Sequence, residues 1–248
     1  MVERLRRHRR LLIASVPPLL LAVTALDGRA VPVASAAATF TFWLLLYATA
    51  SHRLRRLLLV GLFAATVGEV VFSLGLGMYE YRQGGIPLYV PPGHTVLYAS
   101  IFLFVRLPEV RRRARWLWPT LFLLGAGWSL ALWRFAHDSF GLVCFALFTA
   151  LLLAVPRARL FFAAMYLLVA YLELCGTAAG AWAWPAALLG RPGAISSANP
   201  PSGVAVFYCL FDLSCLGLYF ATRFTHFERW VQRLVFLRGQ PQRGPNFS

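Results

Sequence analysis

Eight long apolar runs, separated by groups of arginine, restrict the fold of this 248-residue chain more than any other feature of its sequence. A helix that crosses a hydrocarbon core of about 30 Å needs roughly 20 apolar residues. The chain is 59% hydrophobic and only 13% charged, whereas a water-soluble domain carries about 25% charged residues. We therefore expect an all-α, polytopic integral membrane helix bundle that fills residues 1–248 as a single membrane domain. Its eight transmembrane helices are expected near residues 11–26, 34–50, 57–77, 92–107, 116–134, 139–156, 159–180 and 202–222.

The arginines indicate how such a bundle lies in the membrane. The chain contains 24 arginines and no lysine. Most of them fall at one set of helix ends, and only four fall at the other set: Arg29, Arg82, Arg134 and Arg191. By the positive-inside rule, this distribution predicts a multi-pass protein of the inner (cytoplasmic) membrane with both termini in the cytoplasm. The net charge of +15 is then a topology signal that also suits anionic membrane lipid, and it does not indicate a nucleic-acid partner.

The N-terminal segment allows an alternative interpretation. The arginines within residues 4–10, the apolar stretch after them and Ala34-Ser35-Ala36 resemble a secretory signal peptide. Cleavage there would leave seven helices and an N-terminus outside the cell. An internal repeat, which needs the first helix, favours its retention.

Two blocks of the sequence carry the same order of features. Residues 69–98 and residues 173–208 each contain a Glu late in a helix, an aromatic-x-aromatic exit, a Pro-Pro helix start and a Tyr after it. The matching residues are Glu69, Tyr79, Tyr81, Pro91, Pro92 and Tyr98 in the first block and Glu173, Trp182, Trp184, Pro200, Pro201 and Tyr208 in the second. With four helices per half, the pattern predicts a parallel four-plus-four repeat, with halves 1–107 and 108–223 and a basic cytoplasmic tail, 224–248. Chance similarity between aromatic-rich membrane segments is the alternative.

Three acidic residues, Glu69, Glu173 and Asp212, fall inside the expected helices. A charged side chain costs about 2.5–3.5 kcal/mol at a helix centre on insertion scales, and no arginine lies at a comparable depth. Burial without a cation favours the protonated acid, so we take these three as candidate catalytic residues in the outer half of the membrane. The structural alternative is that each carboxyl group only hydrogen-bonds a neighbouring helix. Tyr208, one turn before Asp212, is expected to donate a hydrogen bond to it.

The loops of the two blocks, 78–91 and 181–201, are the longest connections and are expected on the extracytoplasmic side. Long loops with fixed aromatic residues commonly carry function, so any site is expected to open outwards. The candidate substrate-binding residues are Tyr79, Tyr81, His94, Tyr98, Trp182, Trp184, Asn199 and Tyr208. The four cysteines lack CxxC spacing and the five histidines are scattered, so we expect neither a metal site nor a cofactor.

The second block also resembles known families of membrane enzymes. Gly180-Ala181-Trp182-Ala183-Trp184, after Glu173 and before Asn199-Pro200-Pro201, is similar to the Gly-x-Trp-x-Trp exit and Asn-containing helix start of the membrane carotenoid-biosynthesis hydratases. The resemblance covers about 40 residues, and it departs from the family because Gly85-Ile86-Pro87 occurs in the first block instead. The size and the intramembrane acids also look like the small integral-membrane terpene cyclases. Both resemblances imply acid-initiated addition to an isoprenoid double bond without a cofactor.

The leading hypothesis is therefore a membrane enzyme, an isoprenoid hydratase (a lyase) or cyclase (an isomerase), whose partners are membrane lipid and a lipophilic isoprenoid or carotenoid substrate. Neutral Glu69 or Glu173 would protonate an alkene, and Asp212 would stabilise the cation or accept the final proton. The aromatic rings of both blocks would shield the cation. A small lipid or proton-coupled transporter and a non-catalytic membrane assembly subunit are the alternatives.

Overall fold

A computed structural model describes residues 9–215 and 217 of the chain. The expected tail, 224–248, lies outside the described residues. The elements in chain order are α2 (Val16–Gly28), α3 (Pro32–Thr49), α4 (His52–Glu69), a π-helical turn (Val70–Gly75), β1 (Glu80–Tyr81), α5 (Val90–Phe104), α6 (Pro108–Arg112), α7 (Ala114–Ala136), α8 (Ser139–Ala154), a 3-10 turn (Pro156–Ala158), α9 (Arg159–Ala178), β2 (Trp182–Ala183) and a second 3-10 turn (Leu188–Gly190). Helical residues from Arg9 lead into α2, and a last helix covers Ala205–Cys215.

The all-α class is confirmed, and several helices have the character of membrane spans. In the described part of the chain, five helices are long and apolar enough to cross a membrane: Arg9–Gly28, Pro32–Thr49, His52–Gly75, Ala114–Ala136 and Pro156–Ala178. Three shorter apolar helices, Val90–Phe104, Ser139–Ala154 and Ala205–Cys215, lie where the other three spans were expected. The fold is therefore a helical bundle of membrane type.

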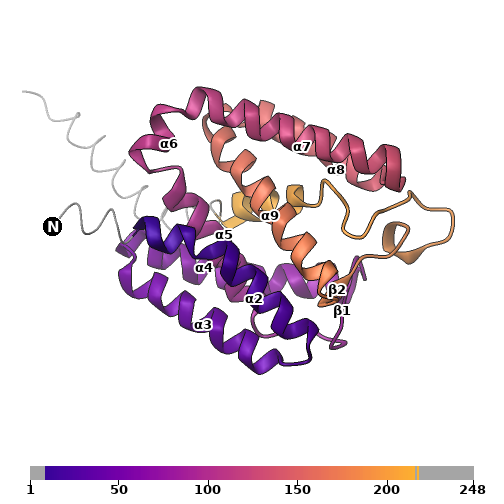
Figure 1. The fold of residues 1–248 in the computed structure, drawn as a ribbon, viewed down its shortest axis with the longest axis horizontal. Helices are drawn as coiled ribbons and strands as arrows, with labels where there is room; N and C mark the ends of the chain where they lie inside the picture. The colour runs from indigo at the N-terminus through magenta and orange to yellow at the C-terminus, as the bar shows by residue number, and fades with distance from the viewer. Residues whose placement is uncertain (1–8, 216, 218–248) are drawn as a thin grey trace, which may run out of the picture.

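Helix α9 lies in the middle of the bundle, where it contacts α2, α5 and α7. Helix α2 packs on α3, α4 on α5, and α7 on α8 (Figure 1). The end of α2 approaches α9 so closely that a Cβ atom on Gly28 would lie 2.1 Å from the carbonyl oxygen of Ala179. Between α3 and α5, the buried indole N–H of Trp43 donates to Thr95 Oγ1 at 2.7 Å. Close backbone approach and buried polar contacts thus fix the helices that surround the site.

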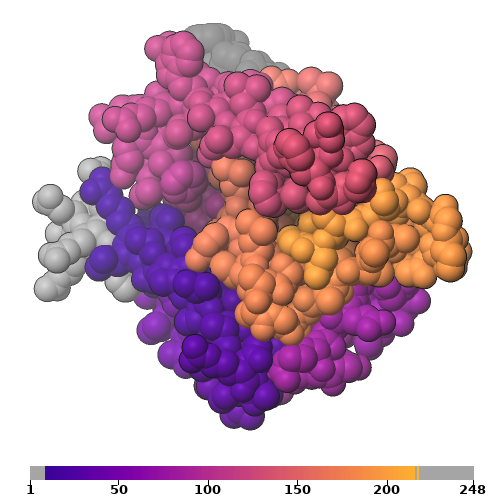
Figure 2. Space-filling view, turned by 45° about the vertical axis from the view of Figure 1, so that its right-hand side comes forward, coloured from indigo at the N-terminus to yellow at the C-terminus, as the bar shows by residue number. Residues whose placement is uncertain are grey.

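The strands β1 and β2 lie together at one end of the bundle, and α6 lies at the other (Figure 1). We call the end with the strands, formed by residues 78–89 and 179–204, the loop end. Figure 2 shows the second of these segments, in orange, lying between the rose-coloured α7–α8 pair and the magenta residues of the first half. The strands pair antiparallel, and the sheet contains only these two strands. This sheet was not predicted, because a two-residue strand leaves no alternating pattern in the sequence.

Helix α4 ends in a π-helical turn that follows Glu69 directly. The amide of Leu76 donates to the carbonyl oxygen of Val71 at 2.8 Å, five residues back. The chain then reverses at Gly77, whose φ of +60° favours glycine. Single π turns inside α-helices occur frequently at functional sites, and here the turn brings the segment after α4 back over Glu69.

Candidate functional site

A largely apolar cavity extends from the loop end into the bundle, between α2, α4, α5, α9 and the last helix. It contains about 1020 Å³ of space not filled by atoms, its mouth included. Ligand sites in proteins are commonly concave and largely apolar with a few polar groups, and this cavity has that character. Eight of the eleven candidate site residues lie on its wall: Glu69, Tyr79, Tyr81, His94, Glu173, Trp182, Trp184 and Tyr208.

Glu69 is buried and is hydrogen-bonded to three side chains. Its Oε2 accepts from the hydroxyl groups of Tyr79, at 2.8 Å, and Tyr81, at 2.7 Å. Its Oε1 lies 2.8 Å from Nε2 of His94, in the first turns of α5. His94, expected as a substrate-binding residue, therefore contacts one of the candidate catalytic acids directly. When the imidazole of His94 is protonated, it forms an ion pair with Glu69.

Glu173 has a similar arrangement with different donors. Its Oε2 accepts from the indole N–H groups of Trp182, at 2.8 Å, and Trp184, at 3.0 Å. Its Oε1 accepts from the hydroxyl group of Tyr208 at 3.1 Å. Trp182 packs tightly on α9, because a Cβ atom on Gly176 would lie 2.0 Å from its ring. The aromatic-x-aromatic motif of each block therefore serves the glutamate of the same block.

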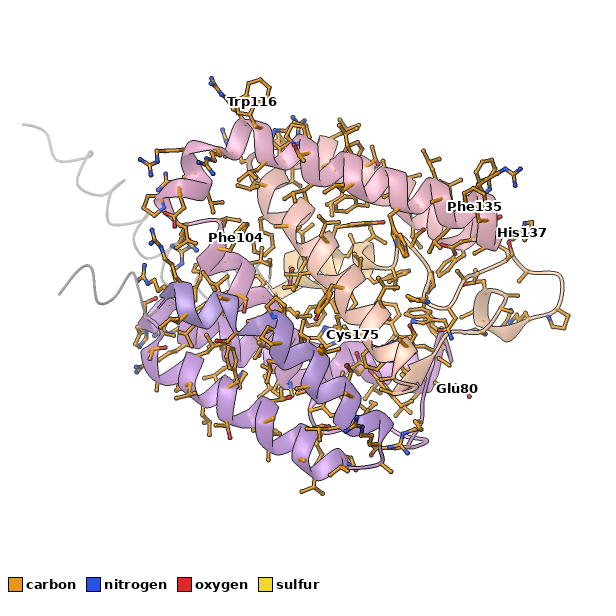
Figure 3. The ribbon with its side chains drawn as sticks, in the orientation of Figure 1. Glu80, Phe104, Trp116, Phe135, His137 and Cys175 are labelled. Atoms are coloured by element: carbon orange, nitrogen blue, oxygen red, sulfur yellow. The ribbon has the colours of Figure 1, made fainter. Side chains whose placement is uncertain are left out.

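The paired strands bring the two motifs together. Tyr81 stands opposite Trp182 in the register of the sheet, and their ring centroids are 6.2 Å apart. The rings of Tyr79 and Trp184, which flank the pair, are 4.8 Å apart. Successive side chains of a strand point to opposite sides, so the tyrosines face the cavity while Glu80 is exposed and points away at the edge of the molecule (Figure 3).

The two tyrosines remain hydrogen-bond donors over a wide pH range. Burial raises the pKa of Tyr79 and of Tyr81 above the usual value of 10.0, and the neighbouring Glu69 charge adds to both shifts. A phenol that keeps its proton is neutral, and its O–H group donates a hydrogen bond to the carboxyl group. Both hydroxyl groups are thus neutral donors toward Glu69 near neutral pH.

Three candidate residues do not reach the cavity. Asp212 is buried, its Oδ2 has no hydrogen-bond partner among the described residues, and it is not on the cavity wall. The predicted bond from Tyr208 to Asp212 is wrong, since Tyr208 donates to Glu173 instead. Helical side chains lean toward the N-terminus of their helix, which turns Tyr208 away from Asp212 and toward the loop end. Tyr98 packs against Phe161, with ring centroids 5.5 Å apart.

Asn199, the third candidate residue that is not on the cavity wall, binds the backbone of the second aromatic motif. Its Oδ1 accepts a hydrogen bond from the backbone N–H of Trp184 at 3.0 Å. The residue that was expected to bind substrate therefore holds the exit segment of the second block in place.

Two buried aspartates that the sequence analysis did not select hold the long loops. Asp27 Oδ2 accepts from the hydroxyl group of Tyr89 at 3.1 Å, and its Oδ1 accepts from the Gln83 side chain. Asp138 accepts from the backbone N–H groups of Gly141 at 3.1 Å, Ala198 at 3.0 Å and Ser202 at 2.7 Å. Each aspartate lies at the turn between the first two helices of its expected half, a shared position that could have identified them.

The described part of the chain holds no cluster of three or more His, Cys, Asp or Glu side chains suited to a metal ion. Searches among protein-family models, curated proteins and solved structures found no match to this chain. The contacts of the cavity are therefore the basis for the function proposed next.

Proposed function

We propose that this protein is an integral membrane enzyme that adds a proton to a double bond of a lipophilic isoprenoid or carotenoid, and so hydrates or cyclises it. The observation that carries the proposal is that two buried carboxyl groups, of Glu69 and Glu173, border one apolar cavity. Protonation of an alkene needs a carboxylic acid in a site that excludes bulk water, and completion of the reaction needs a second group that accepts a proton.

The aromatic side chains of the cavity suit the cation that such a reaction forms. The rings of Tyr79, Tyr81, Trp182 and Trp184 lie beside the two glutamates and beside one another. The face of an aromatic ring attracts a cation by about 0.5–2 kcal/mol, with the larger values in dry surroundings. A cage of this kind would lower the energy of a carbocation without offering it a nucleophile.

The resemblance of the second block to the carotenoid hydratases and the likeness to small membrane terpene cyclases support an isoprenoid substrate. The apolar wall of the cavity suits a hydrocarbon chain. We propose eight membrane spans in the inner membrane, with both termini cytoplasmic and the loop end on the extracytoplasmic side. Substrate would then enter from the lipid, and no cofactor would be required.

We also propose that the chain is a parallel repeat of two four-helix halves. Arg55 precedes Glu69 by 14 positions, and Arg159 precedes Glu173 by the same 14 positions. The strand register further supports the repeat, because Glu80 and Ala183, the middle residues of the two aromatic motifs, are direct partners. A two-fold axis along the membrane normal would relate the halves in this way.

The test is the conversion of an acyclic polyisoprenoid in membranes that contain the protein, followed by lipid extraction and mass spectrometry. Glu173→Gln and Glu69→Gln keep the shape of the side chains and remove the acid, and each should lower product formation by about 100-fold or more. Glu80→Gln, at an exposed position of the loop end, is the matched control and should leave the rate unchanged. A mass gain of one water indicates hydration, and an isomer indicates cyclisation.

Unchanged product formation by both folded glutamine variants would contradict the proposal. If those variants instead lose the flux of a lipid or of protons across proteoliposomes, the result would favour a transporter. Folded variants with neither defect would favour a non-catalytic membrane subunit.

A further inference from the structure

The two glutamates of the cavity differ in the chemistry of their third hydrogen-bond partner. Each accepts two bonds on Oε2 from its aromatic-x-aromatic motif. On Oε1, Glu69 meets the imidazole of His94 at 2.8 Å, whereas Glu173 meets the phenol of Tyr208 at 3.1 Å. Both glutamates thus have two aromatic donors on Oε2. They differ on Oε1, where the partner of Glu69 can carry a positive charge and the partner of Glu173 cannot.

This difference decides where charge can reside in the cavity. An imidazolium beside a carboxylate forms a pair with no net charge, which a buried site tolerates. The groups that face Glu173 are two indoles and a phenol, all of them neutral donors, and in residues 9–215 no cationic side chain forms an ion pair with it. An ionised Glu173 would also repel the carboxylate of Glu69 across the same cavity.

We infer that the two acids have fixed and different roles: Glu173 is the proton donor, and Glu69, kept ionised by His94, is the proton acceptor. This inference rests on the proposed function and deepens it. Glu173 in its acid form carries the proton that the alkene needs. Glu69 in its carboxylate form stabilises the cation and accepts the proton that leaves at the end.

The steps balance for both reactions. The O–H bond of Glu173 breaks, its proton and the alkene π electrons form a C–H bond, and the neighbouring carbon becomes a cation beside the Glu173 carboxylate. In hydration, a water oxygen bonds to that carbon and the water loses one proton to Glu69. In cyclisation, a second double bond attacks the cation and a C–H proton passes to Glu69 as a new double bond forms. Transfer of that proton from Glu69 to Glu173 restores both groups.

Infrared spectroscopy of the purified protein in lipid tests the assignment without substrate, because a carboxylic acid and a carboxylate absorb in separate regions. We expect a carboxylic acid band that disappears in Glu173→Gln and persists in Glu69→Gln. Asp212, whose buried Oδ2 has no hydrogen-bond partner among the described residues, adds a second band, which Asp212→Asn identifies. His94→Gln should create a further acid band, because Glu69 then loses its cation, and the double variant His94→Gln with Glu69→Gln should lack it.

The assignment is overturned if the band disappears in Glu69→Gln instead, or if it persists in both single glutamate variants. Both variants preserve side-chain shape, so the comparison does not depend on His94→Gln folding. The product assay separates the two proposals: a wild-type protein that shows the expected bands but converts no polyisoprenoid contradicts the proposed function alone. An active wild-type protein with the bands reversed contradicts the role assignment alone.

Discussion

Arg159 holds the end of α8 with the same contact that Arg55 makes to the end of α3. In each case Nε donates to a backbone carbonyl oxygen at 2.9 Å, of Leu152 for Arg159 and of Tyr47 for Arg55. The last carbonyl groups of a helix have no partner within it, and a cation there also interacts favourably with the helix dipole. Both arginines therefore stabilise a helix end on the side of the bundle opposite the strands.

Replacement of Arg159 by Gln should lower the stability of the protein by about 1 kcal/mol, since a half-exposed charged hydrogen bond contributes about that amount. Arg55→Gln should have a similar effect. Thermal unfolding in detergent micelles measures both changes. Arg157→Gln, at an exposed position two residues before Arg159, is the control; an equal loss in this variant would show that general charge, and not the helix-end contact, is responsible.

Gly176→Ala should displace the ring of Trp182 from α9, because the new Cβ atom would lie 2.0 Å from that ring. Overfilling a packed site costs about 1–3 kcal/mol, and the bond from Trp182 to Glu173 would be lost. We expect a lower unfolding temperature and reduced product formation. In Gly127→Ala the added Cβ meets nothing within 4 Å, so this variant should be at least as stable as the wild type. A Gly176→Ala protein with wild-type stability would contradict the close packing.

Asp138→Ala should release the segment that leads into the last helix. Three backbone N–H groups lose their acceptor, and each unsatisfied buried donor costs about 1–3 kcal/mol. Hydrogen exchange of peptides that cover residues 196–204 should become faster, while exchange in β1 should change little. Asp138→Asn keeps one acceptor oxygen and should give an intermediate result. Unchanged exchange at Ala198 and Ser202 would rule out this anchoring role.

The buried tyrosines predict a loss of stability in alkali. The pKa values of Tyr79 and Tyr81 are raised above 10.0 in the folded protein, so the folded state keeps protons that the unfolded chain releases. Their contribution to stability is complete below pH 10.0 and declines as the pH rises beyond that value. The double variant Tyr79→Phe with Tyr81→Phe should unfold with a weaker dependence on alkaline pH. Tyr47→Phe, in α3, is the control, and an equal weakening there would contradict the prediction.

Much of the helical framework could be predicted from the sequence, because its signals are local. The expected spans 34–50, 139–156 and 159–180 correspond to α3, α8 and α9 with ends within two residues. Apolar length fixes such helices, and Pro and Arg mark where they begin. The strand pair has no comparable local signal, since its partners lie about one hundred positions apart in the chain.

The site could be predicted in part for the same reason. Glu69 and Glu173 were identifiable because a carboxyl group inside an apolar helix is costly. The partner of Tyr208 was not, because helical spacing suggests a neighbour on the same helix and the actual acceptor is on α9. Asp138 is the N-cap of α8, where aspartate is common, and Asp27 lies in the last turn of α2. Their shared position in the two expected halves marks them as a pair, but the loop groups that they bind become visible only in the folded structure.

Among the described residues, the side chains hydrogen-bonded to Glu69 all lie in the first half of the chain, and those hydrogen-bonded to Glu173 all lie in the second. A nascent chain enters the lipid from its N-terminus onward. The carboxyl group of Glu69 can thus find its partners while the second half is still on the ribosome, and the side chains that bind Glu173 follow within the second half. The acid of each half can therefore enter the bilayer with its hydrogen bonds already made by side chains of the same half.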